Sequence, residues 1–364
     1  MNIIIKKKPL EDILQKLSGG ISSKNMQILS FVLIDVLDKK VQLTVTDLEV
    51  TLSCERDAEV QEKGSICVPF KSFLSIVRCL ADSGVELVSK DDKLWIRCEQ
   101  CEYVLNGVPK QNFPKIPTVK EKQVVKVLSK DIKEMIEMTS FCSFVGESNY
   151  VLSGVLFEIE KNTVRLVATD GKRLAKAERK LSKDQAAVTG KISFILPLKA
   201  VNEVSKNLKD QEEALISFGK KQVDFDLGDV LLSSRVIEGE FPDYQKYIPV
   251  ESTEKVNIER EEFLQALRRA SILTTTEHKG IKLEIKKDRI NISRKTPQLG
   301  EYKEKIKASH EGKELSMGFN PDYLIDVLKN SSSASVLFDV YGSDKPVVFR
   351  EEGYLYLALP MRID

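Results

Sequence analysis

The chain repeats one pattern of apolar residues three times, at intervals of about one domain length. A helical spacing begins at Leu10 and at Ile132 (i, i+3, i+4, i+7) and again at Phe263 (i, i+1, i+4, i+7), so successive copies start 122 and 131 residues apart. The three predicted helix faces are Leu10, Ile13, Leu14 and Leu17; Ile132, Met135, Ile136 and Thr139; and Phe263, Leu264, Leu267 and Ala270. Self-similarity at such a period indicates one structural unit used three times.

A second amphipathic helix follows a strand-like segment in each copy. The segments are 65–69, 193–197 and 315–319, and the first two end in a proline, which is favourable at a helix start. The apolar faces of these helices are Phe70, Phe73, Leu74 and Val77; Leu198, Val201, Val204 and Leu208; and Tyr323, Leu324, Val327 and Leu328. Strand-like segments fill the rest of each copy, so we expect two helices on antiparallel strands.

The fold class is therefore predicted to be α+β, with three similar repeats of two helices packed on antiparallel strands. Proline-containing joints near 114–117 and 247–250 separate the repeats. We predict three domains, 1–118, 119–249 and 250–364, each large enough for its own core.

Composition bounds the location and the function. The chain has no apolar run near the length of a membrane span, and Met1–Lys8 places its charges after its apolar run, unlike a signal peptide. We expect a cytoplasmic protein. Its 56 basic and 55 acidic residues nearly cancel, whereas a protein that grips DNA through phosphates is usually clearly basic.

Basic residues nevertheless recur on the second helix of two repeats. Lys71 and Arg78 lie seven positions apart, and so do Lys199 and Lys206, which places each pair on one helix face opposite the apolar residues. Ordinary solvated helix faces explain this pattern, and so does a surface turned toward a polyanion.

Signals for catalysis and metal binding are weak. Of the six cysteines, only Cys98 and Cys101 have metal or redox spacing, and neither His278 nor His310 is part of a second pair of ligands. Two reduced cysteines in a hairpin are the favoured interpretation. The chain has no phosphate-binding glycine loop, no nucleophile elbow and no zinc-helix motif. We predict no metal, no cofactor and no catalytic residues, and a binding scaffold rather than an enzyme.

The stretch 167–175 carries the strongest turn signal. Asp170-Gly171 lies between apolar and alternating residues, which predicts a β-hairpin. On its own this is a hairpin with an exposed Lys-Arg edge, or, less favoured, a loop with Asp170 as a catalytic carboxylate.

Four short motifs give the chain a resemblance to a known family. They are ATDGKRLA at 168–175, GEFPDY at 239–244, GFN at 318–320 before Tyr323, and LPMR at 359–362. Their order and spacing make the chain similar, over its whole length, to the bacterial sliding clamp, the β subunit of DNA polymerase III.

The resemblance implies the DNA clamp fold, with each chain forming half of a closed ring. It implies a head-to-tail homodimer around duplex DNA, bound without regard to sequence. Such a ring is non-catalytic, although it is a subunit of a DNA-directed DNA polymerase holoenzyme. It tethers the replicative polymerase α subunit, the clamp loader and other replication and repair proteins, and so confers processivity.

The resemblance also assigns site residues. Partner peptides, with a glutamine and a hydrophobic tail, would enter a groove formed by Leu152, Thr169, Gly171, Lys172, Arg173, Leu174, Pro242, Lys246, Tyr247, Asn320, Tyr323, Val347, Leu359, Pro360, Met361 and Arg362. DNA would face Lys24, Lys71, Arg78, Tyr150, Lys199 and Lys206. The dimer interface would use Lys71, Phe73, Leu74, Leu105, Ile272, Leu273, Glu301 and Glu304. Lys172, Lys246 and Tyr247 depart from the residues common in the family, which bears on groove specificity.

One alternative remains open from the near-zero net charge. A monomeric repeat scaffold could bind peptides without encircling DNA. Sedimentation at low concentration separates the two hypotheses, because the scaffold would run near the 41.1 kDa of one chain.

Overall fold

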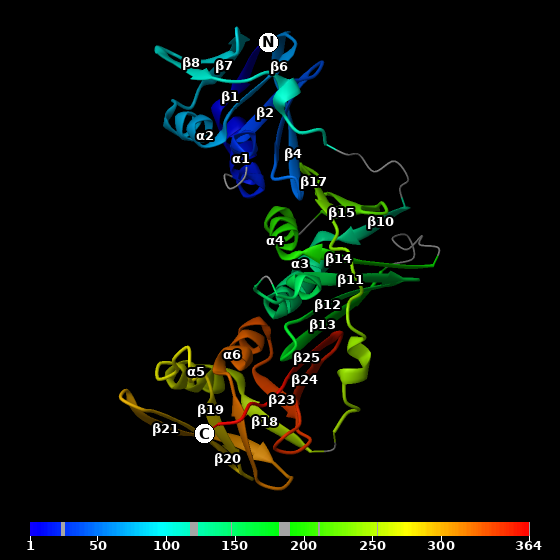
Figure 1. Cartoon of the computed structure of the whole chain (residues 1–364), viewed down its shortest axis with the longest axis vertical. Coiled ribbons are helices and arrows are strands. Elements are labelled where there is room, and N and C mark those ends of the chain that lie inside the picture. The colour runs from blue at the N-terminus through cyan, green and yellow to red at the C-terminus, as the bar shows by residue number, and fades with distance from the viewer. Residues whose placement is uncertain are drawn as a thin grey trace. The chain divides into compact units, whose positions relative to one another are not determined.

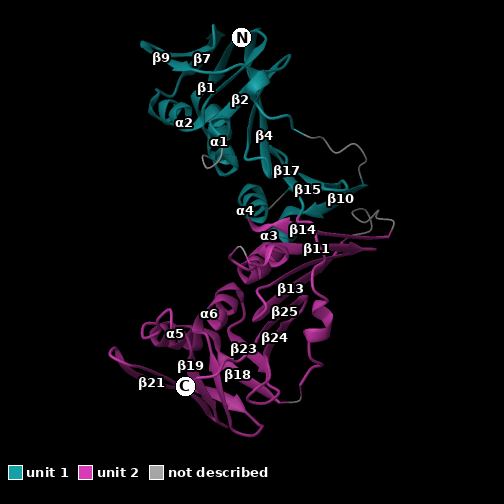
Figure 2. Ribbon diagram, in the orientation of Figure 1, with its two compact units in different colours: residues 1–133, 182–189, 199–236 teal, residues 134–181, 190–198, 237–364 magenta. Residues whose placement is uncertain are grey.

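The computed structural model describes residues 1–22, 26–116, 123–146, 148–181, 190–209, 212–252 and 254–363 (Figure 1). The described residues form two compact units (Figure 2). Unit 1 is drawn from residues 1–133 and 199–236, and unit 2 from residues 134–181, 190–198 and 237–364.

Unit 1 contains the first repeat and part of the second. Its helices are α1 (Lys7–Leu17), α2 (Phe70–Cys79) and, from its second residue, α4 (Leu198–Asn207). Its strands are β1 (Asn2–Lys6), β2 (Phe31–Val36), β3 (Lys40–Thr46), β4 (Val50–Asp57), β5 (Glu59–Glu62), β6 (Gly64–Pro69), β7 (Gly84–Lys90), β8 (Lys93–Cys98), β9 (Cys101–Asn106), β10 (Gln123–Leu128), β15 (Glu213–Phe218), β16 (Gln222–Asp226) and β17 (Val230–Arg235).

Unit 2 contains the rest of the second repeat and all of the third. Its helices are α5 (Arg260–Ser271) and α6 (Pro321–Asn330), and α3 (Ser129–Thr139) ends in it. Its strands are β11 (Gly154–Glu160), β12 (Thr163–Thr169), β13 (Arg173–Lys180), β14 (Lys191–Pro197), β18 (Lys255–Glu259), β19 (Ile281–Ile285), β20 (Arg289–Thr296), β21 (Gly300–His310), β22 (Leu315–Phe319), β23 (Ser335–Asp339), β24 (Val347–Glu351) and β25 (Tyr354–Ala358).

The predicted helix faces are buried, except that Leu198 and Tyr323 of the second pattern are half-buried and Leu208 lies just past the end of α4. All twelve positions of the first helix pattern, on α1, α3 and α5, are at most 3% exposed. α1 and α2 lie side by side, as do α5 and α6 (Figure 1). The α+β class and the repeated helix pair are confirmed. As the segments 65–69 and 193–197 predict, Pro69 and Pro197 are the last residues of β6 and β14, and their helices begin at the following residue.

Every strand pair is antiparallel, and two sheets extend from one repeat into the next. In unit 1 the sheet order β10-β15-β16-β17-β4-β3-β2-β6 joins the second repeat to the first through β17 and β4. In unit 2 the order β14-β11-β12-β13-β25-β24-β23-β18-β21-β20-β19-β22 joins the second repeat to the third through β13 and β25. Unit 1 also holds the sheet β5-β1-β7-β8-β9.

These strand pairs define two comparable regions. The first joint comprises β4, β17, α4 and the turn 46–50; the second joint comprises β13, β25, α6 and the turn 169–173. The first lies within unit 1 and the second within unit 2. The division into three domains with boundaries at 118 and 249 stays a prediction.

Candidate peptide-binding site

The turn 169–173 is held by its own side chains. The Thr169 hydroxyl donates to the Arg173 carbonyl (2.6 Å) and accepts from the Gly171 amide (3.1 Å). One carboxylate oxygen of Asp170 accepts from the amides of Lys172 and Arg173, at 2.9 and 3.0 Å. Gly171 has φ +84°, a left-handed conformation that costs glycine little. The predicted hairpin is confirmed, and Asp170 is engaged in forming it.

Arg173 joins this turn to the third repeat. Its guanidinium donates to Asp170 (3.0 Å), to Asp326 of α6 (2.7 Å) and to the carbonyl of Phe141 (2.6 Å). It also lies over the Tyr323 ring, 4.6 Å from the ring centroid. Burial opposes the charge, but the acidic neighbours raise the pKa of Arg173, which stays charged. Sequence reasoning missed Asp326 and Phe141, since no local motif marks them.

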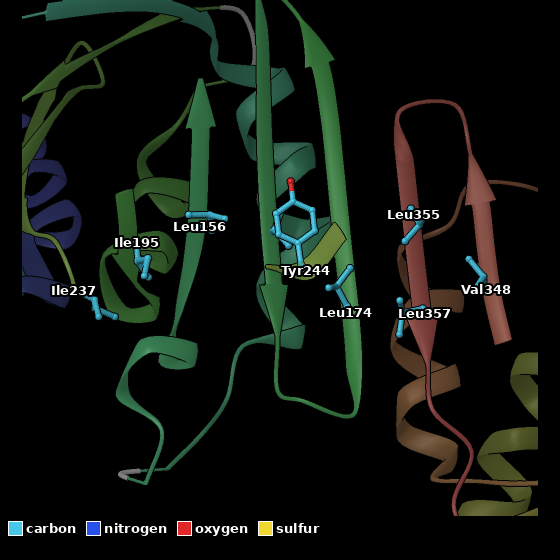
Figure 3. Close-up of a cluster of buried hydrophobic side chains, with 9 residues drawn as sticks. Leu156, Leu174, Ile195, Ile237, Tyr244, Val348, Leu355 and Leu357 are labelled. Carbon is cyan, nitrogen blue, oxygen red and sulfur yellow. The ribbon is translucent and has the colours of Figure 1, made fainter. Parts of the chain in front are cut away.

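The floor of the predicted groove is apolar and mostly closed. Leu152, Leu174 and Val347 are at most 6% exposed, so they form a packed base. Leu174 belongs to a buried cluster that includes strands of both repeats and Tyr244 of the linker (Figure 3). The remaining members of that cluster are Leu156, Val167, Ile195, Ile237, Val348, Leu355 and Leu357.

The rim of the groove is exposed and combines apolar with basic side chains. Leu359, Met361 and Tyr247 are 42%, 40% and 70% exposed, so each of these apolar side chains is open to a ligand. The other exposed rim residues are Gly171, Lys172, Pro242, Lys246 and Arg362, whereas Thr169 is buried and Arg173, Asn320, Tyr323 and Pro360 are half-buried. Unit 2 thus contains all sixteen predicted groove residues, from the turn, the linker and the chain end.

The terminal segment is fixed by backbone bonds on both sides. The amide of Leu359 donates to the carbonyl of Lys172 (2.9 Å), and the amide of Met361 donates to the carbonyl of Gly318 (2.8 Å). A Cβ at Gly318 would lie 2.4 Å from the Met361 carbonyl oxygen and from Ile363. The glycine of the GFN motif therefore gives this segment room beside β22.

A surface pocket of about 710 Å³ continues from this segment. Its polar and apolar lining suits a ligand that is partly buried and partly hydrated. It is lined by Lys282, Ser316, Met317, Gly318, Ser343, Asp344, Pro360, Met361, Arg362 and Ile363.

The residues predicted to face DNA differ in their contacts. Lys71 and Arg78 are exposed on α2, and Tyr150 is 59% exposed. On α4, Lys199 pairs with Asp47, and Lys206 donates to the Ser18 hydroxyl (3.1 Å). Lys24 lies outside the described residues.

The residues predicted for the dimer interface fall into two groups. Lys71 and Ile272 are exposed, as is Glu301, while Leu105, Leu273 and Glu304 are half-buried. Phe73 is fully buried and Leu74 nearly so, and both side chains belong to the core of the first repeat. Glu304 already accepts from Arg269 of its own chain, at 2.6 and 2.9 Å.

Nothing in the described part of the chain offers a metal site. No group of three or more His, Cys, Asp or Glu side chains there is placed to hold an ion. Cys98 and Cys101 face each other across the β8–β9 hairpin as free thiols.

Comparison with known proteins identifies the family. Three family models match, described as the N-terminal, central and C-terminal domains of the DNA polymerase III beta subunit, over residues 1–117, 126–243 and 245–362. A beta sliding clamp of Haemophilus influenzae is 30% identical over 370 residues, with both chains fully covered. The chain belongs to the bacterial sliding clamps, the β subunits of DNA polymerase III.

Solved structures of sliding clamps agree with this assignment. The DNA polymerase sliding clamp of Bacillus subtilis matches with a TM-score of 0.94 and 28% identity, with both chains fully covered. A sliding clamp of Bartonella birtlesii bound to griselimycin matches with a TM-score of 0.94 and 27% identity, again with full coverage of both.

The family decides between the hypotheses drawn from the sequence. The clamp function for DNA polymerase III is confirmed, and the monomeric scaffold is not favoured. Sliding clamps are non-catalytic processivity factors, so the clamp is not an enzyme. No helix in the described ranges is long and apolar enough to span a membrane.

Proposed function

We propose that two copies of this clamp close head to tail into a ring around duplex DNA and carry partner proteins along it. Each copy would contribute three domains, 1–118, 119–249 and 250–364. The observation that carries the proposal is the order of contacts between repeats. In both joints, a turn at a strand end is bonded to the second helix of the following repeat.

The contacts are specific in both joints. Asp47 of the first turn pairs with Lys199 on α4, and Arg173 of the second turn pairs with Asp326 on α6. The corresponding third turn follows Thr296; its Gln298 has φ +69° and its Leu299 is 56% exposed. By the same order of repeats, this third turn would meet helix α2 of a second copy.

Two open strand edges support ring closure. In the described part of the chain, β9 has β8 as its only neighbour, and β21 pairs with β20 alone from Gly300 to Lys307. Exposed edges are usually covered or blunted. Tyr103 and Val104 are 40% and 47% exposed on β9, and Ile272 is 75% exposed after α5. These are the apolar surfaces that a second copy would cover.

Inside such a ring, helices α2 and α4 would present Lys71, Arg78, Lys199 and Lys206 to DNA phosphates. Contacts of this kind position the duplex and carry no sequence information. Lys199 would have to exchange Asp47 for phosphate, so the grip would be weak. That fits a clamp held on DNA by its closed topology rather than by net positive charge.

The groove would receive short peptides of the polymerase α subunit, the clamp loader and other partners. The griselimycin-bound clamp of Bartonella birtlesii supports a ligand site on this fold. The exposed Leu359, Met361 and Tyr247 over a packed apolar floor suit hydrophobic peptide residues.

Retention on DNA tests the ring. We expect the clamp, loaded on nicked circular DNA, to co-elute with the circle and to be released when a restriction enzyme linearises it. Sedimentation should show a dimer of the 41.1 kDa chain. Equal retention on circular and linear DNA, or a monomer at micromolar concentration, would contradict the proposal.

A separate experiment tests the groove. Leu359→Ala with Met361→Ala removes two exposed side chains, so stability should change by no more than about 0.5 kcal/mol. Binding of a labelled peptide should weaken by about tenfold or more, since these are two of the three large apolar side chains exposed on the proposed rim. Leu337→Ala, at a 41% exposed position on β23, is the matched control and should bind normally. Unchanged affinity in the double variant would reject this groove.

A further inference from the structure

The linker segment 239–250 would form one wall of the proposed groove, and it is fastened at two points. Its first fixed point is Tyr244, which is 5% exposed and packs in the buried cluster with Leu174. Figure 3 shows the Tyr244 hydroxyl directed away from Leu174. That hydroxyl donates to the Glu158 carboxylate of β11 at 2.7 Å.

Glu158 is a buried charge with two partners. Its second oxygen accepts from Lys191 of β14 at 2.6 Å. Burial alone would raise the pKa of Glu158, but the hydrogen bonds from Lys191 and Tyr244 outweigh burial and lower that pKa. The carboxylate therefore stays charged, and a hydrogen bond to a charged group is stronger than one between neutral groups. Burial, together with this carboxylate, raises the pKa of Tyr244 to about 12, so the phenol remains the donor.

The second fixed point lies on the third repeat. Arg350 of β24 donates to the carbonyl of Pro249 (2.6 Å), and the Tyr341 hydroxyl donates to the carbonyl of Val250 (2.6 Å). Arg350 is itself oriented by Asp339, at 2.9 Å, and Asp339 is 2% exposed. These donors satisfy two linker carbonyls in succession and so fix the path of the backbone there.

The part of the linker between the two fixed points consists of Gln245, Lys246, Tyr247 and Ile248. Ile248 packs against the buried cluster, whereas Gln245, Lys246 and Tyr247 are exposed. Lys246 and Tyr247, the two proposed groove residues between the fixed points, are thus held by their neighbours rather than by their own burial.

We propose that Tyr244 and Arg350 are positioning residues of the peptide groove. They would hold the Lys246–Tyr247 wall at a fixed distance from Leu359 and Met361 and so set the width that a hydrophobic peptide tail meets. This inference rests on the groove assigned above. It concerns residues outside the groove, which act through Tyr247.

The test separates positioning from stability. Tyr244→Phe keeps the buried ring and removes only the hydroxyl; the matched control is Tyr354→Phe, which removes the hydroxyl that donates to the Met138 carbonyl at 3.1 Å in the same unit. Both variants lose one buried hydrogen bond. We expect the affinity for a fluorescein-labelled decapeptide, with one glutamine and a hydrophobic tail, to fall roughly tenfold in Tyr244→Phe and to stay within about twofold in the control. The Tm should fall in both variants, and further in Tyr244→Phe, because its lost hydrogen bond has a charged acceptor.

Variants of Glu158 complete a double-mutant cycle. Glu158→Gln keeps an oxygen that can accept from Tyr244 and should restore most of the affinity that Glu158→Leu loses. In the Glu158→Leu background, Tyr244→Phe should have no further effect, because the bond is already absent. Arg350→Lys, which cannot reach both Asp339 and Pro249 in the same geometry, should weaken peptide binding in the same direction.

The outcomes are distinct. If wild type binds the decapeptide and Tyr244→Phe binds it equally well, or if both phenylalanine variants weaken it in parallel with their Tm, the positioning role is rejected. If wild type does not bind the decapeptide at all, the groove assignment itself fails.

Discussion

The two joints share one backbone design and differ in chemistry. The turn at 46–50 has the same set of internal hydrogen bonds as the turn at 169–173, from a threonine hydroxyl and an aspartate carboxylate. Beside each turn, an amide at or just after the end of the neighbouring strand donates to a turn carbonyl. Arg235, the last residue of β17, donates to Glu49, and Leu359, directly after β25, donates to Lys172, both at 2.9 Å. The repeat unit therefore dictates the geometry of both joints.

The side chains decide what each joint can bind. At the positions that match Leu174 and Leu359 of the second joint, the first joint has Thr51 and Arg235. The same scaffold thus presents an apolar rim in one place and a polar one in the other. We therefore attribute the proposed peptide binding to a few substitutions on the repeat and not to the repeat itself.

The acid on the second helix shows the same divergence. Glu203 of α4 and Asp326 of α6 occupy matching positions, since each carbonyl accepts from an asparagine four residues later at 2.9 Å. Asp326 is paired with Arg173. At the first joint Val50 takes the place of Arg173. One carboxylate oxygen of Glu203 is buried there without a hydrogen-bond partner, and the Lys206 ammonium lies 3.9 Å from it. The first joint therefore leaves a buried carboxylate oxygen without a hydrogen bond, whereas at the second joint the matching acid pairs with an arginine.

Removing Arg173 should have the largest effect. Arg173→Ala leaves Asp170, Asp326 and the Phe141 carbonyl without their buried partner, and breaking such a pair costs about 3–5 kcal/mol of unfolding free energy. Chemical denaturation measures the loss. Lys172→Ala, one residue away and exposed, is the control and should stay within about 0.5 kcal/mol of wild type. A loss below about 1 kcal/mol for Arg173→Ala would mean that the second joint does not depend on this cation.

Glu203→Gln should stabilise the clamp at neutral pH, by about 1–2 kcal/mol, because it removes a buried, incompletely paired charge. Burial raises the pKa of Glu203, despite the opposing lysines Lys206 and Lys199. The folded state therefore binds this proton more tightly than the unfolded state. Wild type should lose stability as pH rises from the ordinary glutamate range through the folded pKa, and the variant should lose less.

Thermal unfolding of wild type and Glu203→Gln between pH 4 and pH 8 checks this. The stabilisation should vanish at the acid end, where Glu203 is protonated in both states. The Asp326→Asn variant is the counterpart at the second joint. It should destabilise at neutral pH, since Asp326 has its arginine. If Glu203→Gln and Asp326→Asn changed the stability at neutral pH in the same direction, the difference between the joints would be contradicted.

The sequence predicted the helices and the hairpin but not these contacts. The apolar spacing on α1, α3 and α5 identified buried faces directly, because burial on a helix is a local, periodic property. Arg173 was assigned to the groove from its motif, yet its guanidinium is engaged by Asp326 and Phe141, which lie 153 and 32 residues away along the chain. Sequence spacing carries no information on such partners.

The contacts of the linker could not be predicted from sequence spacing either. GEFPDY marked Tyr244 as part of a family motif, but only the fold brings its hydroxyl to Glu158, 86 residues earlier. Phe73 and Leu74 were assigned to an interface from the family resemblance, and both side chains are buried within the chain itself. Their part in an interface stays a prediction, because an apolar helix stripe has the same pattern whether it faces its own sheet or a partner.

Substitutions at the matching turn positions 48 and 171 should change the unfolding free energy by about 1 kcal/mol each, with opposite signs at the two joints. Leu48 adopts φ +79°, the conformation that Gly171 adopts with φ +84°. A side chain in this region costs about 1 kcal/mol, so Leu48→Gly should stabilise the clamp if its side chain, 44% exposed, packs little. Gly171→Ala should destabilise it by a similar amount through φ alone, since an added Cβ would meet nothing within 4 Å. Differential scanning calorimetry of both variants measures whether stability rises or falls, and a stabilising Gly171→Ala would refute the strain argument.

The smallest effect should come from the ion pair of the first joint. Lys199 is 39% exposed and Asp47 10%, so Lys199→Gln should cost only about 0.5 kcal/mol, a typical value for a pair in contact with water. Asp47 is left in place because its carboxylate also holds the Glu49 and Val50 amides. Salt discriminates between the joints: the cost of Lys199→Gln should fade between about 0.05 and 1 M salt, whereas that of Arg173→Ala, whose side chain is 12% exposed, should largely persist. If both costs faded equally, the guanidinium of the second joint would be as hydrated as the surface lysine of the first.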